Sequence, residues 1–185
     1  MAASERIVLG SGKLYCMEYA GSIPEDSVIE TAENQLGHIS GGASVEYKPT
    51  FYSCKDDLGV VQKSVLTDEE ATLKSGVMTW VAQTLQKLCA TGRVTEDSTK
   101  KVRTLKIGGV GNQDGKSYIL HFVHEDPEGD IRLTIVGRNE AGFTLTFAKD
   151  KETIVDAEFK AQPKLDSEGT LIIYKEEIVT STVSE

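Results

Sequence analysis

The fold is decided by IRLTIVG (131–137) and FTLTFAKD (143–150), two strand-like runs separated by a turn-like segment that contains Gly and Asn. Each run alternates apolar and polar residues with a period of two, which is the pattern of a half-buried β-strand. Ile131, Leu133 and Ile135 share one face, and Phe143, Leu145 and Phe147 share another. The reverse faces carry Arg132, Thr134, Thr144 and Thr146. The pair therefore predicts two paired strands in a sheet with one buried side and one polar, Thr-rich, wet side.

Working outward, the whole stretch from Lys101 to Tyr174 consists of strand-like runs bounded by Gly, Pro, Asn or Asp. Residues 118–123 and 171–174 are apolar on both faces, so we expect them to be covered twice. Residues 154–160 place Asp156 and Glu158 opposite an apolar face. The Asp114-Gly115 pair favours a tight hairpin between the first two of these strands. Residues 176–185 form an acidic and Ser/Thr-rich end that we expect to be flexible.

The first half of the chain adds further strands and one helix. Strands are predicted at 43–54, 60–66 and 71–77, with a turn at 55–59, and Pro49 marks an edge or a bulge. Between 80 and 90 the apolar residues recur at helical spacing, which predicts one helix whose apolar stripe packs on the sheet. Thr79 is its expected N-cap and Gly92 its expected C-terminal glycine.

A long segment, 16–42, lacks strand character and is acidic. No Lys or Arg occurs between Lys13 and Lys48. A long loop inside a compact domain is uncommon and points to function or to contact with a partner, although a mobile surface loop would have the same composition. We expect it to dock on a neighbouring subunit through five apolar anchors: Ile23, Val28, Ile29, Leu36 and Ile39.

Length and composition place limits on the function. The 185 residues fit a single domain, 1–185, and no apolar run approaches the roughly 20 residues needed to cross a bilayer. The N-terminus lacks the features of a secretory signal. Cys16, Cys54 and Cys89 have neither metal-ligand nor redox spacing, as expected of free thiols in a reducing cytoplasm. The net charge of −9 argues against tight nucleic-acid binding; it fits solubility alone, or a surface that stays near DNA without sticking.

The sequence gives only weak support for any catalytic or metal-binding group. His121 and His124 stand three apart on a predicted strand, so their side chains diverge and predict no metal site. The stretch 109–117 resembles a phosphate-binding loop, but Val110 stands where Gly is required and a strand follows where a helix is needed. His38 lacks a Ser or Cys nucleophile in a suitable motif. Asp156 and Glu158 would suit hydrolysis, yet nothing else frames a pocket, so we expect neither an enzyme nor a cofactor.

Several stretches together resemble the major tail tube protein of tailed bacteriophages. They are ETAENQLG (30–37) leading into GGASVEY (41–47), KDDLG (55–59) followed by DEEATLKSG (68–76) and Trp80, and GFTLTF (142–147) ending with GTLIIY (169–174). The resemblance covers roughly Ser4 to Lys175 and lies in the order of the parts rather than in one sharp motif. It implies a β-sandwich or barrel with a flanking helix and long loops, and stacked hexameric rings that enclose a DNA channel.

The resemblance implies that the chain's main partner is itself. The other partners would be the tape measure protein, the tail terminator and the distal tail or baseplate proteins, with DNA passing without specific binding. The location would be the virion tail, assembled in the cytoplasm of the host bacterium. The expected lumen face comprises Thr134, Thr144, Thr146, Asp156 and Glu158. The alternatives are a tube of a contractile tail, a phage-tail-like bacteriocin or a type VI secretion apparatus, and, from another class, a monomeric β-sandwich binding module.

Overall fold

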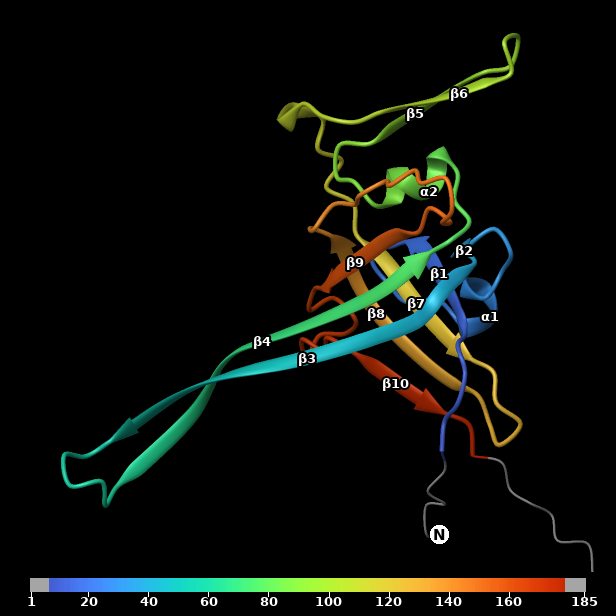
Figure 1. The fold of residues 1–185 in the computed structure, drawn as a ribbon. Coiled ribbons are helices and arrows are strands. Elements are labelled where there is room, and N and C mark those ends of the chain that lie inside the picture. The colour runs from blue at the N-terminus through green and yellow to red at the C-terminus, as the bar shows by residue number, and fades with distance from the viewer. Residues whose placement is uncertain (1–6, 179–185) are drawn as a thin grey trace, which may run out of the picture.

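The computed structural model describes residues 7–178 and confirms a mainly β protein with short helices (Figure 1). Within these residues the strands are β1 (Lys13–Glu18), β2 (Gln35–Gly37), β3 (Ile39–Lys55), β4 (Gln62–Val77), β5 (Arg93–Asp97), β6 (Val102–Lys106), β7 (Tyr118–His124), β8 (Ile131–Asn139), β9 (Val155–Ala161) and β10 (Ile173–Glu176). The helices are α1 (Asp26–Ile29), α2 (Ala82–Lys87) and a 3-10 turn, η1 (Val110–Asn112).

The main sheet is antiparallel and curls until its two ends meet. Its strand order is β2-β1-β7-β8-β9-β4-β3, with β10 paired beside β8. The two outermost strands, β2 and β3, are consecutive in the chain and only His38 separates them. The backbone N–H of His38 donates to Thr79 Oγ1 at 2.7 Å, and its carbonyl accepts from the Met78 N–H at 2.7 Å. The sheet therefore closes on itself around one interior.

The interior of this closed sheet is the larger hydrophobic core. Phe159 of β9 is fully buried there, and Leu85 of α2 and the C-cap residue Leu88 also contribute. The remaining members come from β1, β2, β4, β7, β8 and β9: Leu14, Cys16, Leu36, Leu73, Val77, Tyr118, Leu120, Ile135, Val155 and Ala157. The predicted alternation of β9 is confirmed, because Val155, Ala157 and Phe159 point inward while Asp156 is exposed.

A second, smaller core lies on the outer side of β1, β7 and β8. It consists of Tyr15, Ile29, Ile119, Val123 and Val136, and Ile23 and Leu165 pack against it. The prediction that residues 118–123 are covered on both faces is thus confirmed. The same prediction for 171–174 is wrong, because Tyr174 is exposed, although β10 pairs with β8 within the main sheet.

The pairing of 131–137 with 143–147 is wrong. Residues 143–147 form no strand, and β8 pairs with β7, β9 and β10 instead. Gly137 lies inside β8 rather than in a turn: a Cβ there would stand 2.3 Å from the Lys160 carbonyl oxygen of β9. The missing side chain is what lets the two backbones approach.

The helix near residue 80 is shorter than predicted and begins differently. α2 covers 82–87, its N-cap is Val81, and the Thr84 hydroxyl accepts from the Val81 N–H at 3.3 Å. Thr79 does not cap it, because its hydroxyl already accepts from His38. Gly92 permits close packing, since a Cβ there would lie 2.5 Å from Cys89 Sγ.

Two hairpins also differ from the predictions. β4 is one continuous strand from 62 to 77, so the break between the strands predicted at 60–66 and 71–77 is absent and the β3–β4 hairpin is long. Residues 93–97, ahead of the strand-like stretch that begins at Lys101, form β5, which pairs with β6 in a separate two-stranded sheet. Asp114-Gly115 joins two different sheets rather than a hairpin, because β6 pairs with β5 while β7 pairs with β1 and β8.

We predict that Phe159→Ala lowers the free energy of unfolding by about 3–5 kcal/mol, because it opens a cavity in the closed core. The measurement is urea denaturation followed by circular dichroism. The matched control is Phe51→Ala on the exposed hairpin, where the loss should stay below about 1 kcal/mol. Equal losses for the two variants would contradict the assigned core.

Candidate assembly surface

The outer half of the β3–β4 hairpin projects from the body as an arm, which we define as residues 46–70 (Figure 1). Every residue of the arm is exposed, whereas Ala71, Leu73 and Val77 at its base are buried. β9 pairs with β4 only from Thr72 to Val77, so beyond that point β3 and β4 pair only with each other. An isolated two-stranded hairpin is marginally stable in water. The arm is therefore a surface that gains from a partner.

Each face of the arm carries an exposed apolar pair. Phe51 stands opposite Leu66 and Tyr52 stands opposite Val65 in the register of the hairpin. Because adjacent residues of a strand point to opposite faces, each face carries one aromatic–aliphatic pair. Phe51 is 59% exposed and Tyr52 is 64% exposed. Contiguous exposed apolar surface of this kind marks an interaction site.

The tip of the arm is an ordered turn with a further apolar group. The Asp56 carboxylate accepts from the Val61 N–H at 2.8 Å, and the Asp56 N–H donates to the Val61 carbonyl at 3.0 Å. Leu58, Val60 and Val61 are exposed around this turn. Cys54 is also exposed, whereas burial raises the pKa of the Cys16 thiol to about 12. Cys54 thus provides a natural reporter of contact at the arm.

The outer edge of β3 is open. In the described residues β3 pairs with β4 alone, which leaves one row of backbone donors and acceptors without a strand partner. Lys48 and Pro49 lie in this strand, and such residues protect an edge from indiscriminate pairing. The predicted edge position of Pro49 is confirmed. An open, guarded edge suits pairing with a specific strand of another chain.

A polar face covers the base of the arm and β9, and its charges pair with one another. Lys74 contacts Glu158 at 3.0 Å and Lys160 contacts Glu70 at 2.6 Å. The hydrogen bond from Lys160 lowers the pKa of the Glu70 carboxyl below its usual value. These side chains line a hollow of about 220 Å³ together with Glu46, Lys48, Thr72, Glu140 and Ala141. The face is a mixed-charge wall rather than a uniformly acidic one.

The structure separates the five residues predicted to share a lumen face. Asp156 and Glu158 lie together on the outer side of β9. Thr144 and Thr146 are exposed but belong to an irregular segment. Thr134 is only 3% exposed, and its hydroxyl oxygen lies 2.8 Å from His121 Nδ1. The assignment of Thr134 to a wet face is wrong, because the segment 19–34 covers this part of β8.

The segment 16–42 is not the free docking loop that its composition predicts. It contains part of β1, α1, β2 and the start of β3. Ile29 and Leu36 are buried in the protein's own cores, so neither is an anchor for a neighbour. Ile23 and Ile39 pack partly against those cores, and only Val28 of the five is exposed. Removing 24–37 would therefore damage the fold before it affected any assembly.

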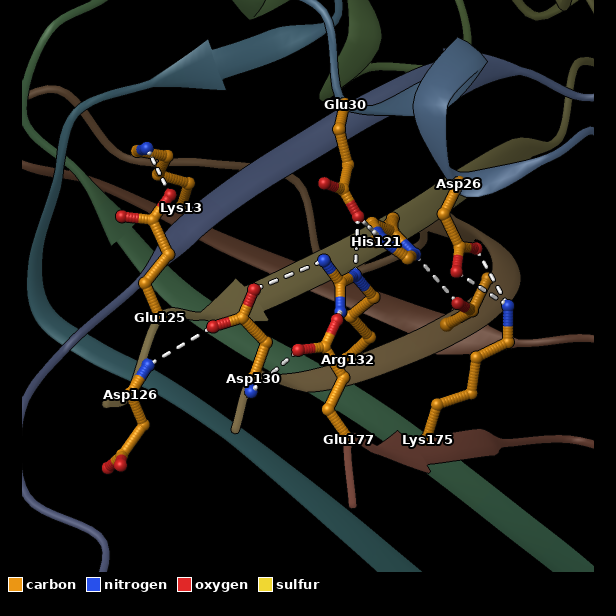
Figure 2. A network of polar contacts seen from close by, with 11 residues as sticks. Lys13, Asp26, Glu30, His121, Glu125, Asp126, Asp130, Arg132, Lys175 and Glu177 are labelled. Carbon is orange, nitrogen blue, oxygen red and sulfur yellow. Dashed lines mark hydrogen bonds and ion pairs between the residues drawn. The ribbon is translucent and has the colours of Figure 1, made fainter. Parts of the chain in front are cut away.

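An ionic cluster holds this segment against the sheet (Figure 2). The Arg132 guanidinium on β8 donates to Glu30 at 2.7 Å and also contacts Asp130 and Glu177. The same Glu30 oxygen lies 3.1 Å from Nε2 of the buried His121. The carboxylates raise the pKa of Arg132, so it stays charged. Sequence reasoning missed this cluster because its members are distant in the chain.

The histidines of β7 serve separate contacts. His121 faces Glu30 and Thr134, while His124 Nδ1 lies 2.6 Å from the Ser11 carbonyl oxygen. Their predicted divergence is confirmed. Among residues 7–178, no group of three or more His, Cys, Asp or Glu side chains is arranged to hold a metal ion. In the same range no helix is both long and apolar enough to cross a membrane.

No protein-family model matches the chain, and no curated protein matches it significantly.

The sequence contains a pattern that indicates apolar surface on both faces of the arm, and the strand predictions did not use it. In FYS (51–53) and VL (65–66), apolar residues are adjacent rather than alternating. Adjacent apolar residues in a strand place apolar surface on both faces. In a hairpin that nothing else covers, this means exposure on both sides. That no other element covers it is a property of the tertiary structure.

We predict that Arg132→Gln lowers the free energy of unfolding by about 1–3 kcal/mol, because Glu30 loses its charged partner beside a buried histidine. Urea denaturation measures it. Arg103→Gln is the matched control, since Arg103 forms an exposed pair with Glu96 whose loss should cost no more than about 1 kcal/mol. If the cluster contributes no more than an exposed ion pair, both variants will show the same small loss in the free energy of unfolding.

Proposed function

We propose that this chain is a self-assembling structural subunit, the major tail tube protein of a tailed bacteriophage. The observation that carries the proposal is the arm, which exposes apolar pairs on both faces and an open strand edge. A lone soluble chain gains little from such an element, and a second copy of the chain would cover it. Repeated contacts between copies would build the rings that the sequence resemblance implies.

The arm favours pairing with other copies, because strand addition would satisfy its open backbone edge and also cover its exposed apolar side chains. A neighbouring strand on the edge of β3 would bond the open row of backbone groups. It would also extend the sheet and bury Phe51 or Tyr52. Joined sheets from several subunits would form one large barrel without exposed edges, which is the architecture of a tube.

The channel wall in this proposal is the polar face of β9 and the base of the arm. Asp156 and Glu158 keep their assigned role there, and Thr144 and Thr146 remain candidates on a neighbouring exposed segment. Lys74 and Lys160 are paired with acids, which limits their attraction for phosphate. A wall of paired charges and free acids would let DNA slide.

The remaining expectations follow from the same proposal. The partners would be other copies of the chain and the proteins that set tail length and close its ends. The location would be the virion tail after assembly in the bacterial cytoplasm. A tube of a contractile tail, a bacteriocin or a type VI apparatus would use the same architecture, and the last two would carry no DNA.

One observation favours a different class, a monomeric binding module. Tyr47, Phe51 and Tyr52 are exposed aromatic residues, as in many carbohydrate-binding sites. A flat binding platform, however, gathers its aromatic residues on one face of a sheet. Here Tyr52 stands on the face opposite Phe51, and the arm has no rigid sheet behind it. The two-sided arrangement is better explained by burial between protein subunits.

We predict that the double variant Phe51→Ser, Tyr52→Ser stays folded but no longer assembles, because it removes apolar burial from both faces of the arm. Sedimentation velocity and negative-stain microscopy measure assembly. Maleimide labelling of Cys54 measures arm coverage, which should protect this thiol in assembled wild-type protein only.

The matched control is Val110→Ser, an apolar residue on η1 that is even more exposed and lies outside the arm. It should assemble like the wild type. Rings or tubes formed normally by the arm variant would refute the role of the arm. Wild-type protein that stays monomeric at high concentration, with Cys54 always reactive, would refute the proposed function itself.

We also predict that Asp156→Lys with Glu158→Lys leaves tubes intact but slows DNA transit, because clustered lysines bind phosphate. The measurement is the rate of DNA ejection from virions that carry the variant. Glu33→Lys with Glu168→Lys makes the same charge change at exposed sites away from β9 and should leave the rate unchanged. Equal rates in both variants would remove β9 from the channel wall.

A further inference from the structure

The β5–β6 hairpin is a basic element on an acidic protein. Residues 93–106 carry five basic and two acidic side chains, whereas the whole chain has a net charge of −9. The hairpin forms its own two-stranded sheet and projects from the body above α2 (Figure 1). Leu105 is the residue of the hairpin that packs partly against the main core. Residues 95–104 are exposed and open to a partner.

Three cations of this hairpin lack an internal partner. Arg103 is paired with Glu96 at 3.3 Å and Lys100 lies 3.6 Å from Asp97. Within the described part of the chain, no ion pair involves Arg93, Lys101 or Lys106. Arg93 and Lys106 stand opposite each other in the register and so share one face. The hairpin thus presents uncompensated positive charge.

Lys101 adds a backbone observation at the tip. It has a φ of 53°, and in residues 7–178 it is the one non-glycine residue with a positive φ. A lysine is disfavoured in this left-handed conformation, which glycine adopts without steric strain because it lacks a Cβ. Strain of this kind is tolerated where a particular side chain is needed. The tip therefore keeps a positive charge where the backbone alone would favour glycine.

The opposite end of the molecule is acidic. The turn between β7 and β8 contains Glu125, Asp126, Glu128 and Asp130, and Glu176 and Glu177 lie beside it at the end of β10. The Glu177 N–H donates to the Asp130 carbonyl at 2.9 Å, which joins the two segments. Arg132 and Lys13 neutralise part of this charge through Asp130, Glu177 and Glu125. In Figure 1 this acidic end and the β5–β6 hairpin lie at opposite ends of the body.

We propose that the β5–β6 hairpin of one copy docks on the acidic β7–β8 turn of the next, so that subunits stack head to tail. The inference rests on the proposed function and adds a second, axial contact to the contact made by the arm. Two different complementary patches at opposite ends form a heterologous contact, which repeats along a line instead of closing as a dimer. Opposite charges at these ends also favour one orientation of stacking over the reverse.

The test uses two full-length variants that reverse the two patches separately. One carries Lys100→Glu and Lys101→Glu, and the other carries Glu128→Lys and Glu176→Lys. Each should fold like the wild type, because the four side chains are exposed. Each should lose long tubes when alone, since its two ends now repel. An equimolar mixture should form tubes again, because the ends of the two variants alternate in complementary order.

Negative-stain microscopy and sedimentation velocity measure tube length at about 0.05 M and about 0.5 M NaCl, since salt screens exposed charges. Wild-type tubes should shorten several-fold at the higher salt. Lys149→Glu with Lys151→Glu is the charge-matched control and should behave like the wild type. Lys101→Gly separates charge from folding, because it should melt no lower than the wild type and still form shorter tubes.

The outcomes distinguish this inference from the proposed function. Wild-type tubes together with unaffected reversal variants overturn the hairpin contact and leave the arm-based function standing. Wild-type protein that is monomeric at both salt concentrations overturns both. A gel-shift assay with double-stranded DNA covers the remaining case. If the hairpin variant assembles normally but loses a DNA shift that the wild type shows, the hairpin binds nucleic acid and the stacking contact is wrong.

Discussion

The rest of the structure depends on the closure of the main sheet at His38. One residue joins β2 to β3, so the two ends of the strand order must meet, and both backbone groups of His38 bond to the segment 78–79. Gly37 permits the approach, since a Cβ there would stand 2.1 Å from the Thr79 carbonyl oxygen. Closure creates the interior in which Phe159 and its neighbours lose contact with water.

Closure also decides what stays outside. The base of β3 and β4 helps to line the core, but both strands continue far beyond it as the arm. The β5–β6 hairpin leaves the body in the same way above α2. Neither element buries enough apolar surface of its own to explain its length. A molecule with a stable closed sheet and two projecting hairpins is suited to assembly. The closed sheet keeps its structure while the two hairpins bind other copies.

The arm and the β5–β6 hairpin differ in their physical chemistry, and this supports separate roles. The arm carries exposed apolar pairs on both faces, so its proposed contact depends on burial and on backbone pairing. The hairpin is basic, and the complementary acidic surface lies at the other end of the body. The proposed contact between the hairpin of one copy and the acidic end of the next therefore depends on charge. A tube needs one contact that closes rings and another that repeats along the axis. Two kinds of contact allow the two steps to respond differently to salt.

The sequence alone determined the mainly β class, the strand at 118–123 buried on both faces, and the alternation of Val155, Ala157 and Phe159. These features follow from local side-chain periodicity, which a strand reports directly. Only the tertiary structure decided that Thr134 is buried, that Ile29 and Leu36 belong to the protein's own cores, and that residues 46–70 stand free. The reason is physical: exposure depends on which distant segment covers a face. The cover of Thr134 comes from a segment held by Glu30 and Arg132, which are distant in the chain.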